Sequence, residues 1–256
     1  MTVLDTIGRT RLILLRRMAL QGSAWILLKL EYENPTGSIQ DRMARAMIEA
    51  AEADGRLRRG GSVVEYTGGS TGVSLAFVCA AKRIPLQIVT SDAFSKEKRD
   101  HMAALGARLT LVPSPTGGSL RGITTRLRVH HAAVHAVAVE PDASAVLSGR
   151  PSGSHGIEGI GAGFVVPLWN GTLANEIQTM STEEAMPTAR RLAREEGIFA
   201  GTSTGGNVAV ALRVADRLGP DHTVVTVAVD SGMKYLSTAL YSGEPFSGVS
   251  RDAGVD

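Results

Sequence analysis

Short runs of β-branched and aliphatic residues alternate along the chain with longer segments of helical periodicity. The short runs predict strands over residues 25–32, 62–66, 86–91, 108–112, 134–140 and 223–229. Helices are predicted between them, over residues 38–54, 72–83, 95–106 and 181–196, with further helices behind residues 119 and 207. This alternation predicts an α/β fold with mostly parallel sheets and flanking helices.

Two segments carry more specific expectations. Ser181 and Glu184 form a capping-box pattern, which predicts that a helix starts there. Pro187 follows inside that helix, and its missing N–H is expected to kink the helix or delay its start. The apolar, β-branched run 223–229 is the best candidate in the chain for a buried strand.

Composition and charge exclude several classes of protein. The chain has 256 residues, which suits one large α/β unit or two smaller lobes. Its 27 basic and 25 acidic residues leave a net charge of +2, without the clustered basic excess of a nucleic-acid binder. No apolar run reaches the roughly 18 residues of a membrane span, and the N-terminus lacks a secretory pattern, so a cytoplasmic protein is expected.

Candidate metal and redox residues are few. Cys79 is the single cysteine, so an internal disulfide and a cysteine-based zinc cage are excluded, and its apolar neighbours predict a core residue. His130, His131 and His135 lie close together without a further ligand at suitable spacing. We therefore expect no metal site.

Three glycine-rich turns stand where a predicted strand meets a helix. Residues 67–72 combine hydroxyls with bare backbone and suit a carboxylate, whereas 116–119 open a helix and suit a phosphate. The third turn, 201–207, also precedes an apolar helix. Each turn taken alone is weak evidence, because glycine turns at such junctions are usually only turns.

The turns and their flanking segments occur in an order that resembles one known family. The matching segments are residues 7–10, 28–31, 34–38, 67–72, 116–119, 139–141, 156–164, 195–203 and 230–236. Together they resemble the cysteine synthase and cystathionine β-synthase family, which uses pyridoxal phosphate (PLP) and has the tryptophan-synthase-β fold, fold type II. The resemblance extends over nearly the whole chain.

The resemblance implies a two-lobed fold and a defined chemistry. Residues 34–112 would form a smaller α/β lobe, and residues 1–33 and 113–256 a larger one. Members of this family are usually homodimers that use PLP for β-replacement on an O-activated serine, so a small amino acid is the expected partner. The cofactor would supply the electron sink, and the protein the positioning and electrostatics.

The resemblance also assigns residues to the site. Those expected to contact the cofactor are Ser70, Thr116, Gly117, Gly118, Ser119 and Ser231. Those expected to contact the substrate are Thr67, Gly68, Thr71 and Gly159. The hydroxyl of Ser231 would face the pyridine nitrogen and leave it unprotonated, and Ser70 would replace the family's asparagine beside the cofactor's 3′-oxygen.

The residue in the catalytic position departs from the family. The family carries its Schiff-base lysine directly before Asp-Arg, and this chain has Gln40 there. Glutamine has no nucleophilic amine and cannot shuttle the α-proton. The chain has five lysines, Lys29, Lys82, Lys96, Lys98 and Lys234. Three of them fall on helical segments that look solvated, and no motif aims Lys234 at the cofactor, so none is expected to substitute.

A second departure is a missing middle segment. Only three residues separate Val112 from Thr116, and the family has roughly 60 more residues at this place, about two βα units. Pro115 also removes one N–H from the predicted phosphate turn. Three interpretations stay open: a PLP-dependent enzyme with impaired chemistry, a non-catalytic protein that binds PLP or an amino acid, and a relic without activity at the site.

Overall fold

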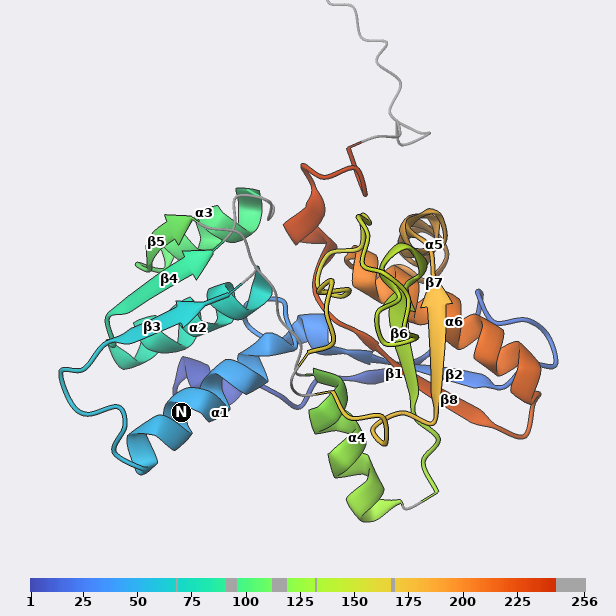
Figure 1. The fold of residues 1–256 in the computed structure, drawn as a ribbon, viewed down its shortest axis with the longest axis horizontal. Helices are drawn as coiled ribbons and strands as arrows, with labels where there is room; N and C mark the ends of the chain where they lie inside the picture. Colours follow the sequence, from blue (N-terminus) through green and yellow to red (C-terminus); the bar gives the residue numbers. More distant parts are fainter. Residues whose placement is uncertain (68, 91–95, 112–118, 132, 167–168, 243–256) are drawn as a thin grey trace, which may run out of the picture.

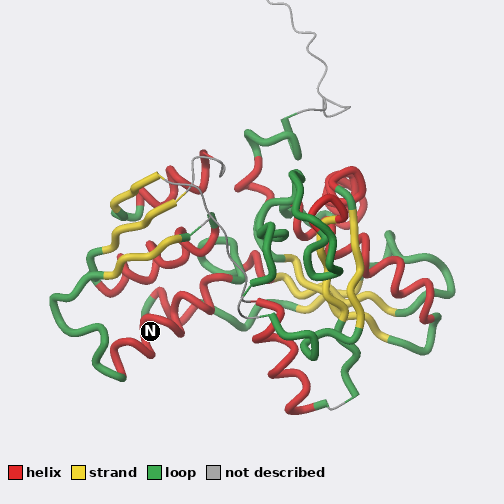
Figure 2. The backbone as a smooth tube through the Cα atoms, viewed as in Figure 1, coloured by secondary structure: helices red, strands yellow, loops and turns green. Residues whose placement is uncertain are grey.

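The computed structural model describes residues 1–67, 69–90, 96–111, 119–131, 133–166 and 169–242. Within these residues the strands form three small sheets, and Figure 2 shows helices between and around them. Four of the five strand pairings are parallel, and only the first two strands run antiparallel. The predicted α/β fold with mostly parallel sheets is therefore confirmed.

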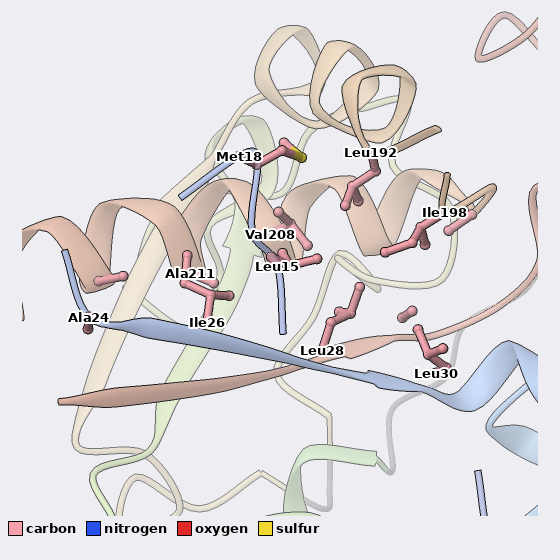
Figure 3. Packing of buried hydrophobic residues seen from close by; sticks show 13 residues of the cluster. Leu15, Met18, Ala24, Ile26, Leu28, Leu30, Leu192, Ile198, Val208 and Ala211 are labelled. Atoms are coloured by element: carbon pink, nitrogen blue, oxygen red, sulfur yellow. The ribbon is translucent and has the colours of Figure 1, made fainter. Parts of the chain in front are cut away.

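The first sheet has the order β1 (Leu12–Leu14), β2 (Trp25–Leu30) and β8 (Thr223–Ala228). Strand β2 buries every second side chain, because successive residues of a strand point to opposite faces. Figure 3 shows the buried residues of β2 packing toward α6 (Thr202–Leu218), which covers one face of the sheet. This cluster is one of the hydrophobic cores of the molecule.

Strand β8 is less buried than its sequence predicts. Its residues are mostly exposed or half-buried, and the Val225 side chain is 58% exposed. In the described residues β8 pairs only with β2 and lies at the edge of the sheet. The prediction that this run is the best candidate for a buried strand is therefore wrong, because an apolar run does not reveal that only one of its faces is covered.

The second sheet is entirely parallel, with the order β3 (Val63–Tyr66), β4 (Leu86–Thr90) and β5 (Arg108–Leu111). Helices α2 (Ser70–Lys82) and α3 (Lys96–Ala104) connect these strands, and α1 (Gln40–Ala53) packs on α2. A separate hydrophobic core fills this part of the molecule, and it contains the buried thiol of Cys79. The location of Cys79 in a core is as predicted.

The third sheet pairs β6 (Val137–Pro141) with β7 (Glu176–Met180) in parallel. Helix α4 (Ser119–His130) precedes β6, and α5 (Thr182–Glu196) follows β7 and packs on α6. The capping box at the start of α5 is confirmed, with hydrogen bonds of 3.0 and 3.1 Å between Ser181 and Glu184. Pro187 lies inside α5 without delaying its start, because the capping box already fixes the first turn.

Figure 1 shows two groups of elements side by side, one with β3–β5 and α1–α3 and the other with the remaining sheets and α4–α6. They meet where the segment before α1 forms an isolated bridge, from Ser38 to Asp230, beyond the end of β8. The lobe bounds at residues 34 and 112 stay a prediction. Among the described helices, none combines the length and apolar character needed to cross a membrane.

Candidate active site

The candidate site lies at the carboxyl ends of β3 and β8, next to the N-termini of α1 and α2. The two strands belong to different sheets, and each is paired in parallel with its neighbour. Parallel strands leave their connecting loops, with their side chains and free backbone groups, at this edge of a sheet. The segments that reach it are the loop before α1, Thr67 after β3 with the first turn of α2, and the short 3₁₀ helix η4 (Gly232–Tyr235) after β8. These are segments that the sequence assigns to substrate and cofactor.

The hydroxyl of Thr67 is buried without a partner. Thr67 is fully buried at the end of β3, and its backbone N–H donates to the Val89 carbonyl at 2.9 Å. Its Oγ1 has no hydrogen-bond partner within the part of the chain that the structure describes. Gly72 keeps this corner compact, because a Cβ there would approach Met102 Sδ to 2.4 Å. A buried hydroxyl left unpaired costs stability, and a ligand atom that accepts from Thr67 Oγ1 would recover that cost.

Asp230 joins several buried polar groups at the end of β8. Its Oδ2 accepts hydrogen bonds from Ser70 Oγ at 3.0 Å and from the Tyr235 hydroxyl at 2.8 Å. Its Oδ1 is buried and has no hydrogen-bond partner among the described residues. Complete burial, followed by the nearby carboxylate of Asp230, raises the pKa of Tyr235 well above its usual value, so this phenol stays protonated and donates.

Backbone hydrogen bonds place Gln40 and Ser231 in the same corner. Ser231 N–H donates to the Gly37 carbonyl at 3.0 Å, and Ile39 N–H donates to the Val229 carbonyl at 3.0 Å. Gln40 is half-buried and begins α1 directly behind this ladder, where its N–H donates to Ser38 Oγ at 3.2 Å. The position of the family's lysine thus lies beside the predicted pyridine partner.

Two lysines that were not expected at the site reach this region. Lys234 is 6% exposed, and its Nζ lies 3.5 Å from Ser70 Oγ. Lys98 is 3% exposed on α3, and its Nζ lies 2.6 Å from Glu158 Oε2 and 3.3 Å from the Tyr235 hydroxyl. The expectation that Lys98 is solvated is wrong. We call Ser70, Lys98, Asp230, Lys234 and Tyr235 the Asp230 cluster.

A signal for Lys98 was present in the sequence. Lys98 and Met102 are four residues apart, so they share one face of α3, and Met102 is completely buried. The Lys98 ammonium also lies 4.4 Å from the centroid of the Tyr235 ring, a cation–π contact. Lys234 gave no comparable signal, because it lies in a single turn of 3₁₀ helix whose direction depends on tertiary contacts.

A second group of polar residues, buried except for Arg42, holds the loop that leads to Gln40. We call Thr10, Glu31, Asn34 and Arg42 the Glu31 cluster. Glu31 accepts hydrogen bonds from Thr10 Oγ1, Asn34 Nδ2 and two nitrogens of Arg42, at 2.6–2.9 Å. Burial raises the pKa of Glu31, but the hydrogen bonds from Arg42 and Thr10 outweigh it, so the net pKa is lowered. Asp41 fixes the same loop by accepting from Thr36 N and Oγ1.

The other expected site residues divide into described and undescribed ones. Thr71 lies in the first turn of α2, and Gly159 adopts φ +93°, a left-handed conformation that favours glycine. Gly159 follows Glu158, the partner of Lys98. Gly68 and the phosphate-turn residues Thr116, Gly117 and Gly118 lie outside the described residues, and Ser119 is described only as the first residue of α4.

The residues present fit PLP and an amino acid. The unpartnered Thr67 hydroxyl is a donor suited to a carboxylate, and the unpartnered Asp230 Oδ1 is an acceptor suited to an N–H group. The hydroxyls of Ser70 and Ser231 are neutral groups beside them. The fold and these residues define an α/β protein with a site for a small polar ligand at the carboxyl ends of its parallel strands.

Comparison with known proteins identifies the family. Residues 3–116 and 110–230 match the family described as pyridoxal-phosphate dependent enzymes. A cysteine synthase of Staphylococcus aureus is 34% identical over 299 residues, covering 94% of this chain and 96% of that protein. The chain belongs to the pyridoxal-phosphate dependent enzyme family and is cysteine synthase-like, which confirms the predicted resemblance and the PLP dependence of the family.

Solved structures agree with this assignment. The structure of an O-ureido-L-serine synthase has a TM-score of 0.88 and 32% identity, covering 99% of this chain and 97% of the other. A lysine-to-alanine mutant of O-ureido-L-serine synthase, solved with O-ureido-L-serine bound, has a TM-score of 0.87 and 31% identity over 98% and 95% of the two chains. The fold is therefore that of the PLP-dependent family.

These matches agree with the prediction that a middle segment of the family is missing from this chain. The two parts of the family match meet at residues 110–116, where the sequence predicts the gap. The alignment to the cysteine synthase has 299 positions but covers only 94% of 256 residues, so roughly 60 positions have no residue in this chain. In the described residues β5 ends the second sheet, and β6 pairs only with β7. Within the described residues, the second sheet therefore ends at β5.

Proposed function

We propose that this chain binds PLP together with an amino acid of the O-activated serine class, and that Gln40 leaves its β-replacement chemistry impaired or absent. The observation that carries the proposal is the buried Thr67 hydroxyl without a partner, in the loop that the family resemblance assigns to the substrate carboxylate. A relic would gain stability by losing such a group, whereas a binding protein needs it.

Each residue of the site has a role in this proposal. Thr67, Gly68 and Thr71 hold the substrate carboxylate, with Gly159 beside the substrate, while Ser70 and Ser231 contact the cofactor ring through neutral hydroxyls. The turn of Thr116, Gly117, Gly118 and Ser119 holds the phosphate. Bound PLP supplies an electron sink for the electron pair left at the α-carbon when its proton is removed.

Gln40 sets the limit on turnover. Its side-chain amide has no basic nitrogen, so it neither binds a carbonyl carbon covalently nor accepts the α-proton. It retains hydrogen-bonding capacity at the same place, which is compatible with holding ligands. The solved lysine-to-alanine mutant of O-ureido-L-serine synthase supports this, because that protein was obtained with O-ureido-L-serine bound. A purely non-catalytic PLP or amino-acid binder is the alternative.

Binding and turnover are tested separately. Equilibrium dialysis of the purified chain against PLP is expected to show retained cofactor, and adding O-acetyl-L-serine is expected to change its absorption spectrum. Production of pyruvate or cysteine is expected to be low or undetectable. Failure to retain PLP in dialysis would contradict the proposal. The Gln40→Lys variant is expected to raise turnover if the rest of the site is intact.

A matched pair of variants tests the role of Thr67. Thr67→Val replaces the unpartnered hydroxyl with a methyl group, so the free energy of unfolding is expected to stay unchanged or rise. Binding of O-acetyl-L-serine to the PLP form is expected to weaken about tenfold or more, because a hydrogen bond to a charged group is lost. Ser144→Ala, which removes another unpartnered buried hydroxyl, is the control and is expected to leave binding unchanged.

Two further parts of the proposal rest on the family resemblance. We propose that the protein is cytoplasmic and forms a homodimer, as members of the family usually do. Light scattering coupled to size-exclusion chromatography measures the mass in solution, and a dimer of 26.9 kDa chains is the expected result. A monomer at all concentrations would contradict it.

A further inference from the structure

Lys234 lies closer to the candidate site than the sequence suggests. Its side chain is buried, and its Nζ lies 3.5 Å from the hydroxyl of Ser70, a residue assigned to the cofactor. A Cβ placed on Gly37 would lie 3.9 Å from Lys234 Cε and 3.2 Å from Ser231 Cβ. The end of the lysine side chain thus lies against the loop that leads to Gln40 and next to the predicted pyridine partner.

We propose that Lys234 is the amine that binds PLP covalently in this chain, in place of the lysine that Gln40 replaces. This inference rests on the proposed function, because it needs PLP to bind in the same site. The neutral Nζ adds to the aldehyde carbon of PLP, and a C=N bond forms. The aldehyde oxygen leaves as water with the two hydrogens of the amine, so no oxidant or further reactant is required.

The charged groups around Lys234 make a neutral amine accessible. Burial lowers the pKa of Lys234 to about 8, and the ammonium of Lys98 on α3 acts in the same direction. The carboxylates of Asp230, after β8, and of Asp41, on α1, oppose this shift. His101 on α3 also faces Lys234, and burial together with Lys234 lowers the pKa of that imidazole, so it is neutral near pH 7. Covalent binding is therefore expected to increase as the pH rises through about 8.

Among the described residues, the other four lysines contact residues that are not assigned to the cofactor. Lys98 pairs with Glu158, and Lys82 pairs with Glu52, both at 2.6 Å. Lys96 pairs with Asp100 on the exposed face of α3, and Lys29 donates to the Thr10 carbonyl and lies 4.0 Å from Glu31. Lys234, with its Nζ 3.5 Å from Ser70 Oγ, is thus the amine that lies beside a residue assigned to the cofactor.

Chemical trapping tests the proposal. The full chain is incubated with PLP at about pH 8.5, reduced with borohydride, and digested for peptide mass mapping. An absorption band at about 410–420 nm before reduction, and a reduced phosphopyridoxyl group on the peptide that contains Lys234, are expected. The variant Lys234→Arg keeps the charge without forming the bond, and it is expected to lose both signals. Lys96→Arg, on the exposed side of α3, is the control and is expected to keep them.

The outcomes separate this inference from the proposed function. PLP that is retained in dialysis but trapped on another lysine, or on none, overturns the role of Lys234 and leaves the proposed function standing. Absence of retained PLP overturns both. If the Lys234→Arg variant no longer unfolds cooperatively on heating, its result is set aside. Peptide mapping of the trapped wild-type chain then tests the role of Lys234. In the double variant Gln40→Lys with Lys234→Arg, the trapped group is expected on the peptide that contains position 40.

Discussion

Glu31 and Asp230 are both buried carboxylates beside the loop before α1, but among the described residues only the Glu31 carboxylate has partners for both of its oxygens. Both Glu31 oxygens accept from Thr10, Asn34 or Arg42, whereas Asp230 Oδ1 has no partner within the described residues. A complete buried network fixes a structure, and an incomplete one costs free energy that a ligand recovers. The difference supports the proposal that the first cluster positions the site and the second belongs to it.

The largest effect is expected from breaking the complete cluster. Glu31→Gln removes the charge that holds Arg42 and forces at least one short hydrogen bond to change, so the free energy of unfolding is expected to fall by about 2–3 kcal/mol. Urea denaturation measures this loss. A loss below about 0.5 kcal/mol would show that the cluster does not stabilise the fold in this way.

The contact between Lys98 and Glu158 sharpens the comparison, because it links α3 to the loop of Gly159. Glu158→Gln leaves the buried ammonium of Lys98 beside a neutral amide, and a smaller loss of about 1–2 kcal/mol is expected, since Glu158 is partly exposed. The matched variant Arg191→Gln removes an exposed ion pair within α5 and is expected to cost under about 0.5 kcal/mol. Equal losses in the two variants would contradict the buried contact.

The acid sensitivity of stability comes from the same complete cluster. The folded protein lowers the pKa of Glu31, so its stabilising contribution is fully present above the unfolded value of 4.5. This contribution is lost as the pH falls through the lower folded value. In urea titrations between about pH 6 and pH 3, the difference between wild type and Glu31→Gln is therefore expected to shrink. A difference that stays constant would contradict a lowered pKa.

The smallest effect is expected in the Asp230 cluster, as a shift in pH dependence. The carboxylate of Asp230 raises the pKa of Lys234, so Asp230→Asn is expected to lower it further. The midpoint of covalent PLP binding, followed at about 410–420 nm, is expected to move down by about one pH unit. Ser237→Ala, which removes an exposed hydrogen bond to Glu97, is the control. An upward shift of this midpoint would contradict the claim that the carboxylate of Asp230 raises the pKa of Lys234.

The sequence predicts where helices and strands lie better than it predicts how deeply they are buried. The capping box of Ser181 and Glu184 is local, so its residues alone fix the start of α5. The burial of β8 depends on which face of the strand a helix covers, and the apolar residues of β8 do not show this. Strands β1 and β7 were not predicted, because β1 has three residues and β7 mixes polar with apolar positions.

The site shows the same division. The family resemblance assigned the loops of Thr67, Gln40 and Ser231 to the site, because their motifs occur in the family's order along the chain. The positions of Lys98 and Lys234 depend on contacts between segments that lie 60 or more residues apart, such as those of Lys98 with Glu158 and of Lys234 with Ser70. Side-chain direction across such distances follows from packing and not from a local pattern.

The most direct test of this account is a crystal structure of the chain grown with PLP above about pH 8. The account predicts cofactor at the ends of β3 and β8, with continuous density to Lys234 Nζ. In crystals that also contain O-acetyl-L-serine, a carboxylate oxygen is expected within hydrogen-bond distance of Thr67 Oγ1. PLP bound elsewhere, or a site that leaves Thr67 and Asp230 without partners at saturating ligand, would contradict the claim that the incomplete cluster is a ligand site.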